Sequence, residues 1–312
     1  MAVLGVLTLA SGFILFLLPF SLADAAPNGW STHYIIAVLV LGFILLAAFG
    51  IVERFIAPKP FLPWKKLFNR TLLGACLLMS VYQIAYYCWA SYFTSYLQVV
   101  YNLTLAQAGY VSSTFDVVSG VFLFLIGFLI RKTGRFRWLL LIAVPLYTLA
   151  QGLMIYFRQP NKSIGYIVMC QIFIALGGGT MIICQQVAVL SVAEHSEAAA
   201  TLAMLGLFGW IGGAVGNAIS GAIWTSTFPQ ALNRYLPQSA RADSVAIYGS
   251  LDKQLSYALG SPARDAIVQA YAIAQTRMLT AGTAVMVLAL ICVLVIKNIN
   301  VAEIQQVKGM LF

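Results

Sequence analysis

Long apolar runs of about 20 residues alternate with short polar segments along most of the chain. A helical run of this length crosses a hydrocarbon core about 30 Å thick, because an α-helix rises about 1.5 Å per residue. A transmembrane barrel would instead show strands of roughly 10 residues with alternating polarity. The pattern predicts an all-α, polytopic helical membrane protein with eight spans, at residues 2–22, 34–52, 71–97, 108–130, 137–157, 164–190, 199–224 and 278–297.

Two polar segments divide these spans. Residues 53–70 form a basic linker with three prolines, which break helices, and this linker separates a helix pair in 1–52 from a six-helix bundle in 71–297. The second segment, 225–277, is too long to be a simple connector. We expect either a solvated tether or a functional loop with a short surface helix over 262–274. Residues 298–312 form a tail.

Composition and charge support this class. The chain is 61% apolar and only 9% charged, whereas soluble domains average about 25% charged residues, so a soluble enzyme is excluded. The net charge of +9 comes from clusters beside the spans, which predicts membrane anchoring and no nucleic-acid partner. Short segments on one side carry eleven Lys and Arg against two on the other. The positive-inside rule therefore places both termini, the linker and the tail in the cytoplasm, and 225–277 outside.

The cysteines and histidines give no sign of a metal site. All five cysteines lie inside apolar runs, where a thiol behaves as a small hydrophobic group, and the two histidines stand alone. Neither a disulfide framework nor a zinc spacing is present. We expect no protein-bound metal and no cofactor.

An aromatic stripe is the first candidate binding feature. Aromatic residues recur at intervals of 4, 3, 4 and 3 in span 71–97, which places them on one helix face. The stripe consists of Tyr82, Tyr86, Trp89, Phe93 and Tyr96, with Gln83 and Tyr87 beside it. Such a face suits an amphipathic substrate, and Tyr82, Gln83, Tyr86, Tyr87 and Trp89 are the candidate binding residues. The alternatives are packing, or an outer aromatic belt for Tyr92 and Tyr96.

Asp116 is the only acidic residue inside a predicted span. An ionisable group within the membrane is a functional candidate by default, and proton relay is its usual task. We predict a proton-coupling role, with a solvated or structural role as the alternative.

Glycines and basic residues mark helix contacts and a tight turn. Gly209/Gly213 and Gly212/Gly216 have the spacing that lets two helices approach closely, whereas neither they nor Gly177–Gly179 resemble a phosphate loop. A basic turn joins spans 108–130 and 137–157. Its candidate gating residues are Gly127, Arg131, Lys132, Gly134 and Arg135, and Arg131 and Arg135 are placed to bind the carbonyl end or an acidic group of a neighbouring helix. A plain topogenic turn is the alternative.

The basic turn resembles the loop between the second and third helices of a six-helix half in the major facilitator superfamily, although the usual acidic residue is missing. Further stretches resemble fungal siderophore-iron transporters: Asn69-Arg-Thr, Tyr96-Leu-Gln-Val-Val, Ala108-Gly-Tyr110 and Gly221-Ala-Ile-Trp224-Thr-Ser-Thr-Phe-Pro229. That family is described as having fourteen spans. The resemblance implies that 1–52 is a central helix pair, that 71–297 is the C-terminal bundle, and that the N-terminal half is absent.

The same resemblance implies a function. It implies secondary active uptake of a ferric siderophore with protons, and participation of the outer segment through Tyr235, Tyr248 and Tyr257. Because the siderophore already wraps the iron, the transporter needs no metal cage. The plasma membrane is the expected location, with endosomal or vacuolar membranes as alternatives. A drug or glutathione exporter of the same fold, or a non-functional truncated chain, remains open.

Overall fold

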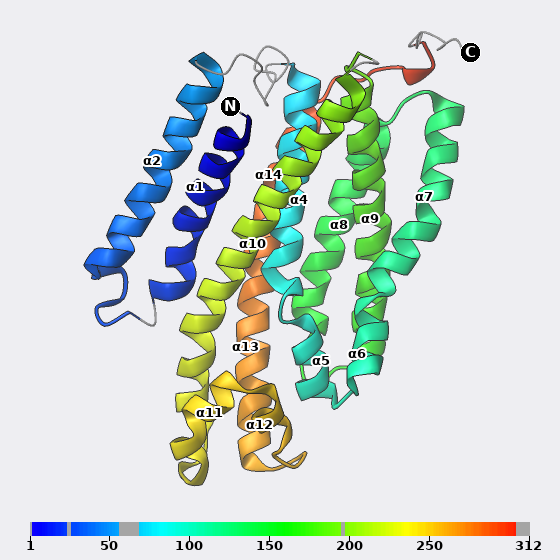
Figure 1. The fold of residues 1–312 in the computed structure, drawn as a ribbon. Helices are drawn as coiled ribbons and strands as arrows, with labels where there is room; N and C mark the ends of the chain where they lie inside the picture. The colour runs from blue at the N-terminus through cyan, green and yellow to red at the C-terminus, as the bar shows by residue number, and fades with distance from the viewer. Residues whose placement is uncertain (1, 24–25, 56–68, 195–196, 304–312) are drawn as a thin grey trace.

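The computed structural model describes residues 2–23, 26–55, 69–194 and 197–303, and its long helices lie side by side along one direction (Figure 1). Most of the linker 53–70 and of the tail 298–312 lies outside these residues. Seven described stretches are long and apolar enough to cross a membrane, namely His33–Val52, Arg70–Tyr101, Leu105–Thr133, Arg137–Phe157, Ile164–Leu190, Ala198–Tyr235 and Pro262–Val295. The predicted first span is helix α1 (Ala2–Leu22), whose described apolar stretch, Leu7–Phe20, is shorter.

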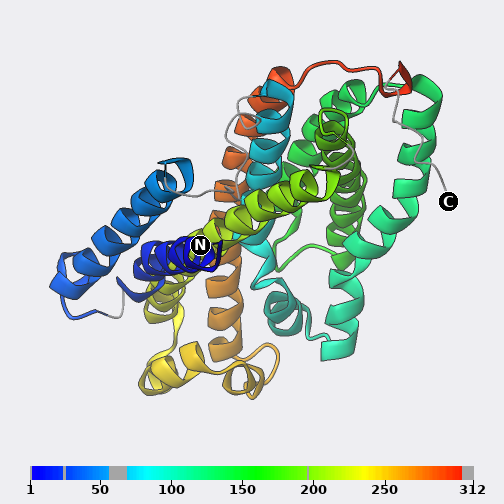
Figure 2. The same ribbon diagram turned by 45° about the horizontal axis from the view of Figure 1, so that its top comes forward.

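The first helix pair lies to one side of the bundle. Helix α2 (His33–Phe55) follows α1 through the short helix η2 (Gly29–Ser31), and it packs on α1, whereas α1 also packs on α10 (Ala198–Tyr235). Figure 2 shows α2 on the side of α1 away from the bundle. Gly42 allows the close α1–α2 approach, because a Cβ there would lie 2.8 Å from the Cα of Phe16.

Two helices form the centre of the bundle. Helix α4 (Arg70–Ala90) packs on α10, and α9 (Ile164–Leu190) packs on α8 (Arg137–Phe157), α7 (Thr114–Thr133) and α4. Helices α13 (Pro262–Val285) and α14 (Val287–Val295) cover α4 and α8. The central helices bury much of their apolar surface within the protein, whereas α2 and α7 leave large apolar side chains exposed, as helices facing lipid do.

The expected close contact through small residues is confirmed between α10 and α4. A Cβ at Gly212 would lie 2.7 Å from the Cα of Ser80, and one at Gly216 would lie 2.7 Å from the carbonyl oxygen of Ile84. The Ser80 hydroxyl also donates to the carbonyl of Phe208 across the contact, at 2.7 Å. Small residues therefore bring the two backbones together, as is common between membrane helices.

The predicted bounds of the segment 225–277 are wrong. Helix α10 continues to Tyr235 and α13 already begins at Pro262, so that only residues 236–261 connect them. The physical reason is an aromatic contact between the two helix ends. The ring of Phe228 lies 4.2 Å from the ring of Trp224 and 5.0 Å from the ring of Tyr271 on α13.

Residues 236–261, which we call the outer segment, fold into η4 (Gln238–Asp243), α11 (Ser244–Gly249) and α12 (Leu251–Leu255). They lie at one end of the bundle, at the bottom of Figure 1, and following the predicted orientation we call this the outer end. The buried Arg264 of α13 connects the outer segment to the bundle. Its guanidinium donates to the carbonyl of Gln254 in the outer segment at 2.6 Å and to the carbonyl of Val99 in the bundle at 3.0 Å.

The expected surface helix over 262–274 is also corrected. A helix does begin after Ser261, whose hydroxyl accepts from the backbone N–H of Arg264 at 3.2 Å. It runs on to Val285, and Ala266, Ala270 and Ala274 are buried on its inner face. The segment belongs to a long packed helix because small alanines let it approach its neighbours.

Two predicted spans are interrupted near the outer end. Span 71–97 is divided into α4 and α5 (Phe93–Tyr101) by Ser91 and Tyr92, and span 108–130 begins earlier, as α6 (Leu105–Ser112), and meets α7 at Ser113. Asn102 ends α5 in the left-handed conformation, and a Thr104–Gln107 capping box begins α6. We call the two interruptions the α4–α5 joint and the α6–α7 joint.

At the inner end, arginines bind the last carbonyls of α14. Arg70 donates to the carbonyl of Val295 and Arg137 to that of Leu294, both at 3.1 Å. Among the residues that the structure describes, Arg70 and Arg137, and not Arg131 or Arg135, hold the carbonyl end of a neighbouring helix. The chain then continues to η5 (Val301–Glu303), where the N–H of Val301 donates to the carbonyl of Gly134 at 2.7 Å.

Candidate functional site

A cavity of about 320 Å³ lies between the two joints and α9. Its lining residues are Tyr86, Tyr87, Trp89 and Ala90 of α4, Ser91 of the first joint, Phe93 and Thr94 of α5, Ser112, Ser113 and Asp116 at the second joint, and Gln171 of α9. We call it the joint cavity. It has aromatic, hydroxyl, amide and carboxylate groups on different walls.

Polar side chains hold the two joints in place. The Ser91 hydroxyl donates to Oδ1 of Asn217 on α10 at 2.6 Å, and the hydroxyls of Thr94 and Ser112 lie 3.3 Å apart. Much of the helical backbone bonding is kept at the joints, since the N–H of Ser113 donates to the carbonyl of Gly109 at 2.9 Å and the N–H of Tyr96 donates to the carbonyl of Tyr92 at 3.1 Å. Each joint is therefore a local irregularity within one long span. The polar side chains gathered at the two joints make this cavity a candidate binding site.

The aromatic wall of the cavity is a chain of ring contacts. The ring of Tyr86 lies 5.5 Å from that of Trp89 and 5.4 Å from that of Phe115, and Trp89 meets Phe93 edge to face at 5.5 Å. Such rings offer large apolar faces, and tyrosine and tryptophan add one polar atom each. The wall can therefore stack against a bulky organic ligand.

The polar groups of the cavity point to a ligand that forms hydrogen bonds. Asp116 is exposed in the first turn of α7. By contrast, Gln171 and Trp89 are each only 1% exposed, and neither Oε1 of Gln171 nor Nε1 of Trp89 has a hydrogen-bond partner in the described part of the chain. Because an unsatisfied buried polar group is costly, such atoms call for water or ligand partners.

The stripe residues have different environments. Tyr86, Tyr87 and Trp89 line the joint cavity together with Asp116, whereas Tyr82 is buried against Tyr147 with ring centroids 5.5 Å apart. Gln83 does not line the cavity, and its side chain packs beside Gly209 of α10.

The outer-belt interpretation is wrong for Tyr96, which is fully buried because α13 and the outer segment pack on α5. Tyr92 is half-buried and stacks on Trp224 with ring centroids 4.2 Å apart.

The tyrosines of the outer region are not brought to the joint cavity. Tyr235 is exposed at the end of α10, and Tyr248 lies near Phe228 with rings 6.2 Å apart. Tyr257 donates to Oδ2 of Asp243 at 2.9 Å, and the ammonium of Lys253 lies 2.9 Å from the same oxygen. The hydrogen bonds from Lys253 and then from Tyr257 hold the pKa of Asp243 below its ordinary value. A cavity of about 330 Å³ adjoins Asp243 and Tyr257.

The predicted gating residues lie at the opposite end of α7. Arg131 and Lys132 are exposed in its last turn, where positive charge suits the helix dipole, and Gly134 ends the helix with φ of +67°. Arg135 forms an isolated β-bridge with Asn300. The turn is therefore joined to the chain after α14, while Gly127 lies in open surroundings within α7.

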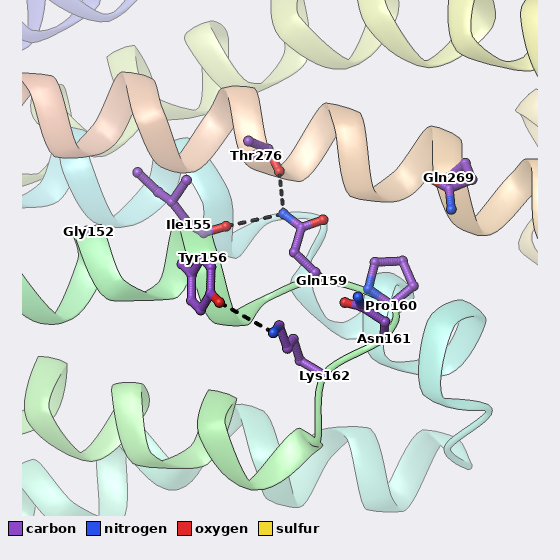
Figure 3. A pocket seen from close by; sticks show the side chains of 9 residues that line it. All are labelled: Gly152, Ile155, Tyr156, Gln159, Pro160, Asn161, Lys162, Gln269 and Thr276. Carbon is purple, nitrogen blue, oxygen red and sulfur yellow. Dashed lines mark hydrogen bonds between the residues drawn. The ribbon is translucent and has the colours of Figure 1, made fainter.

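A larger cavity of about 760 Å³ lies between the outer ends of α8 and α13 (Figure 3). Several of its polar side chains have partners: Gln159 donates to the carbonyl of Ile155 at 3.1 Å and to the Thr276 hydroxyl at 3.0 Å, and Lys162 points at the Tyr156 hydroxyl, 3.5 Å away. None of the candidate residues from the sequence lines it. The joint cavity is the stronger candidate because its buried polar atoms lack partners.

Five polar lining residues were not singled out as site residues from the sequence: Ser91, Thr94, Ser112, Ser113 and Gln171. The available signal was the presence of hydroxyl and amide side chains inside apolar runs. That signal does not say which of them meet, because the two joints lie on different helices.

The chain is similar in sequence to a known family and to several known proteins. Residues 1–217 match the family model of the Major Facilitator Superfamily. The chain is 59% identical over 310 residues to the MFS siderochrome iron transporter D of Aspergillus fumigatus, covering 99% of this chain and 52% of that protein. It is also 59% identical over 308 residues to the siderophore iron transporter mirB of Emericella nidulans, covering 99% and 51%. The chain thus spans about half the length of the curated relatives it matches.

A crystal structure of a bacterial homologue of the human lysosomal transporter Spinster, in an inward-facing and occupied conformation, aligns with a TM-score of 0.46. The alignment has 16% identity and covers 91% of this chain and 68% of that chain.

Proposed function

Because the chain belongs to the major facilitator superfamily, we propose that it forms part of a secondary active transporter that carries ferric siderophores across a membrane, coupled to protons. The names of its relatives, siderochrome and siderophore iron transporters, support the substrate class. The joint cavity supports the location of the binding site. The iron is cargo in this proposal and arrives already wrapped by the siderophore.

The single observation that carries the proposal is the composition of the joint cavity. Its aromatic wall from Tyr86 to Phe93 suits the organic shell of a siderophore, and Gln171, Trp89 and the joint hydroxyls suit its oxygen-rich surface. Asp116 on the facing wall is the candidate proton carrier, because a carboxylate can bind a proton as the ligand arrives and release it as the ligand leaves.

Alternating access requires two parts that move against each other around a central site. In this chain the bundle from 71 to 297 supplies one part. The helix pair in 1–52 packs beside it through α1, and residues 53–70 connect the two as a cytoplasmic linker. We assign the second part to an N-terminal half, since the chain spans about half the length of its relatives. The plasma membrane is the proposed location.

Uptake of a radiolabelled ferric siderophore tests the function. It is to be measured in cells lacking their own siderophore uptake, with the 312-residue chain alone and with that chain joined to the N-terminal half of a full-length relative. We expect uptake only from the joined protein. Uptake of drugs or glutathione with no uptake of ferric siderophores would contradict the substrate class, and robust uptake by the chain alone would contradict the two-part arrangement.

A pair of tyrosine variants tests the site. Tyr86→Ala removes the centre of the aromatic wall of the joint cavity, whereas Tyr156→Ala removes a tyrosine from the larger cavity between α8 and α13. We expect Tyr86→Ala alone to weaken uptake at an unchanged amount of protein in the membrane. The reverse result would move the site to the larger cavity.

A further inference from the structure

Arg158 follows the last residue of α8 and turns its side chain into the bundle. It is only 1% exposed, which makes it one of the largest fully buried side chains of the protein. A guanidinium is protonated at any physiological pH, so a full positive charge is enclosed near the outer end. Burying a charge is costly unless other groups compensate for it.

The usual compensation is missing around this charge. No carboxylate pairs with Arg158 in the described part of the chain, and its Nε and Nη2 atoms have no hydrogen-bond partner there. Its Nη1 atom lies 4.0 Å from the sulfur of Met154, which is a weak acceptor.

Three aromatic rings surround the guanidinium instead. Its central carbon lies 4.1 Å from the ring centroid of Phe93, 4.9 Å from that of Tyr96 and 5.1 Å from that of Trp89. These distances are within the range of cation–π attraction, which is stronger for cations removed from water. The ring faces therefore supply the negative potential that a carboxylate supplies elsewhere.

These rings connect Arg158 to the joint cavity. Trp89 lies in α4 and Phe93 in α5, on either side of the α4–α5 joint, and both also line the joint cavity. Two further contacts hold the joint from α10, namely the bond from Ser91 to Asn217 and the stacking of Tyr92 on Trp224. Arg158, at the end of α8, makes the contact that holds the joint from the α8 side.

We propose that Arg158 is a positioning residue for the joint cavity: its buried charge holds Trp89 and Phe93 across the α4–α5 joint and so fixes the aromatic wall that the substrate meets. The part of this proposal that concerns substrate rests on the proposed function, whereas the effect of Arg158 on Trp89 does not. The charge itself is required, because an apolar side chain of similar length would fill the space without attracting the ring faces.

Fluorescence of Trp89 tests the charge requirement directly. The emission of Trp89 is obtained as the difference between the purified 312-residue chain and its Trp89→Phe variant, each with and without the quencher acrylamide. We expect Arg158→Met to shift this emission and increase its quenching, and Arg158→Lys to retain most of the native signal. Arg234→Met is the matched control, since Arg234 is an exposed arginine at the outer end, 5.5 Å from the ring of Tyr235.

Uptake of ferrichrome, a ferric trihydroxamate, supplies the second measurement, made in the protein that carries out uptake. We expect Arg158→Met to raise the half-saturating concentration by about fivefold, which corresponds to about 1 kcal/mol, because the substrate meets an aromatic wall that is no longer held in place. Maximal uptake should change little. Loss of maximal uptake at an unchanged half-saturating concentration would contradict positioning and favour a purely structural role.

The two measurements separate the possible failures. If Arg158→Met leaves the Trp89 emission and quenching unchanged, the positioning role is overturned whatever the uptake result. If the unmodified protein takes up no ferric siderophore while the Trp89 signal responds to the charge, the proposed function fails and the positioning of Trp89 stands. Should Arg158→Met not fold, Arg158→Gln removes the charge while keeping a polar side chain, and an unchanged Trp89 signal in that variant would equally overturn the proposal.

Discussion

The hydroxyl of Thr94 lies 3.3 Å from the hydroxyl of Ser112, and this contact connects two interrupted helices at the edge of the joint cavity. Thr94 follows the α4–α5 joint, and Ser112 precedes the α6–α7 joint. The contact therefore links the two joints directly at the edge of the site. The same geometry places Asp116 one turn beyond the second joint, within reach of a ligand that contacts Tyr86.

Asp116→Asn removes the carboxylate from the joint cavity with little change in size. If Asp116 carries the coupled proton, most of the uptake of ferric siderophore is lost, and the remainder no longer depends on external pH, because an amide cannot bind and release a proton. Uptake at a series of external pH values checks this. Asp265→Asn, at an exposed carboxylate in the first turn of α13, is the control. A normal pH response in Asp116→Asn would assign the coupling elsewhere.

Gly212→Ala should destabilise the bundle. The added methyl group would lie 2.7 Å from the Cα of Ser80, and the backbones of α10 and α4 cannot separate without disturbing the packing around them. The expected cost is about 1–3 kcal/mol. Gly206→Ala, on the same helix with nothing within 4 Å of the new Cβ, should cost nothing or stabilise slightly. Thermal unfolding of both variants in detergent compares them, and equal midpoints would contradict close α10–α4 packing.

Gly134→Ala should loosen the connection between the inner turn and the chain after α14. Gly134 has φ of +67°, and a Cβ there would collide with Oδ1 of Asn300, so strain and overlap act together. The positive φ alone costs about 1 kcal/mol. Gly127→Ala in the same helix meets no atom within 4 Å and serves as control. Faster hydrogen exchange at Val301 in Gly134→Ala only is the expected result, and equal exchange in both variants would argue against it.

The outer segment should open in acid. The pKa of Asp243 is lowered by its hydrogen bonds from Lys253 and Tyr257, so its contribution to stability is present above the ordinary carboxyl pKa of about 3.9 and is lost as the pH falls through the lowered value. At the other limit, the pKa of Lys253 is raised by Asp243, so its contribution is lost only as the pH rises through that raised value. Between these two pKa values the contacts of Asp243 with Lys253 and Tyr257 are intact.

Hydrogen exchange of residues 244–255 checks this pH dependence. Exchange corrected for its intrinsic pH dependence should rise in the unmodified chain as the pH falls below about 4 and through the lowered pKa of Asp243. Asp243→Asn should show the faster exchange already at neutral pH, with little further change in acid. Asp252→Asn, which alters a neighbouring acidic residue of α12, is the control. A pH response that persists in Asp243→Asn would locate the titrating group elsewhere.

Hydropathy predicted several helices to the residue. Spans 137–157 and 164–190 coincide with α8 and α9, because these helices are predominantly apolar along their whole length and are bounded by polar or charged residues. The ends of α10 and α13 were missed. Their outer turns have a polar sequence, and only the contacts among Trp224, Phe228 and Tyr271 show that these turns are packed as continuous helix.

The candidate site was predicted only in part, again because contacts between helices are not visible in a local sequence pattern. Helical periodicity placed Tyr86 and Trp89 on one face, and the scarcity of intramembrane charge singled out Asp116. Periodicity assumes an unbroken helix, and so it could not show that the helix is interrupted at Ser91 and Tyr92, or that Tyr96 is buried.

The sequence by itself determined that this is a polytopic helical membrane protein, since runs of about 20 apolar residues cannot satisfy their backbone in lipid by other means than helices. The sequence also identified the aromatic residues of the site and Asp116, because the aromatic residues lie within one span and Asp116 lies within another. Tertiary structure decided where helices break, which polar atoms are buried without partners, and that Arg158 stands behind Trp89 and Phe93. These features depend on contacts between segments far apart in the chain, which no local pattern of residues records.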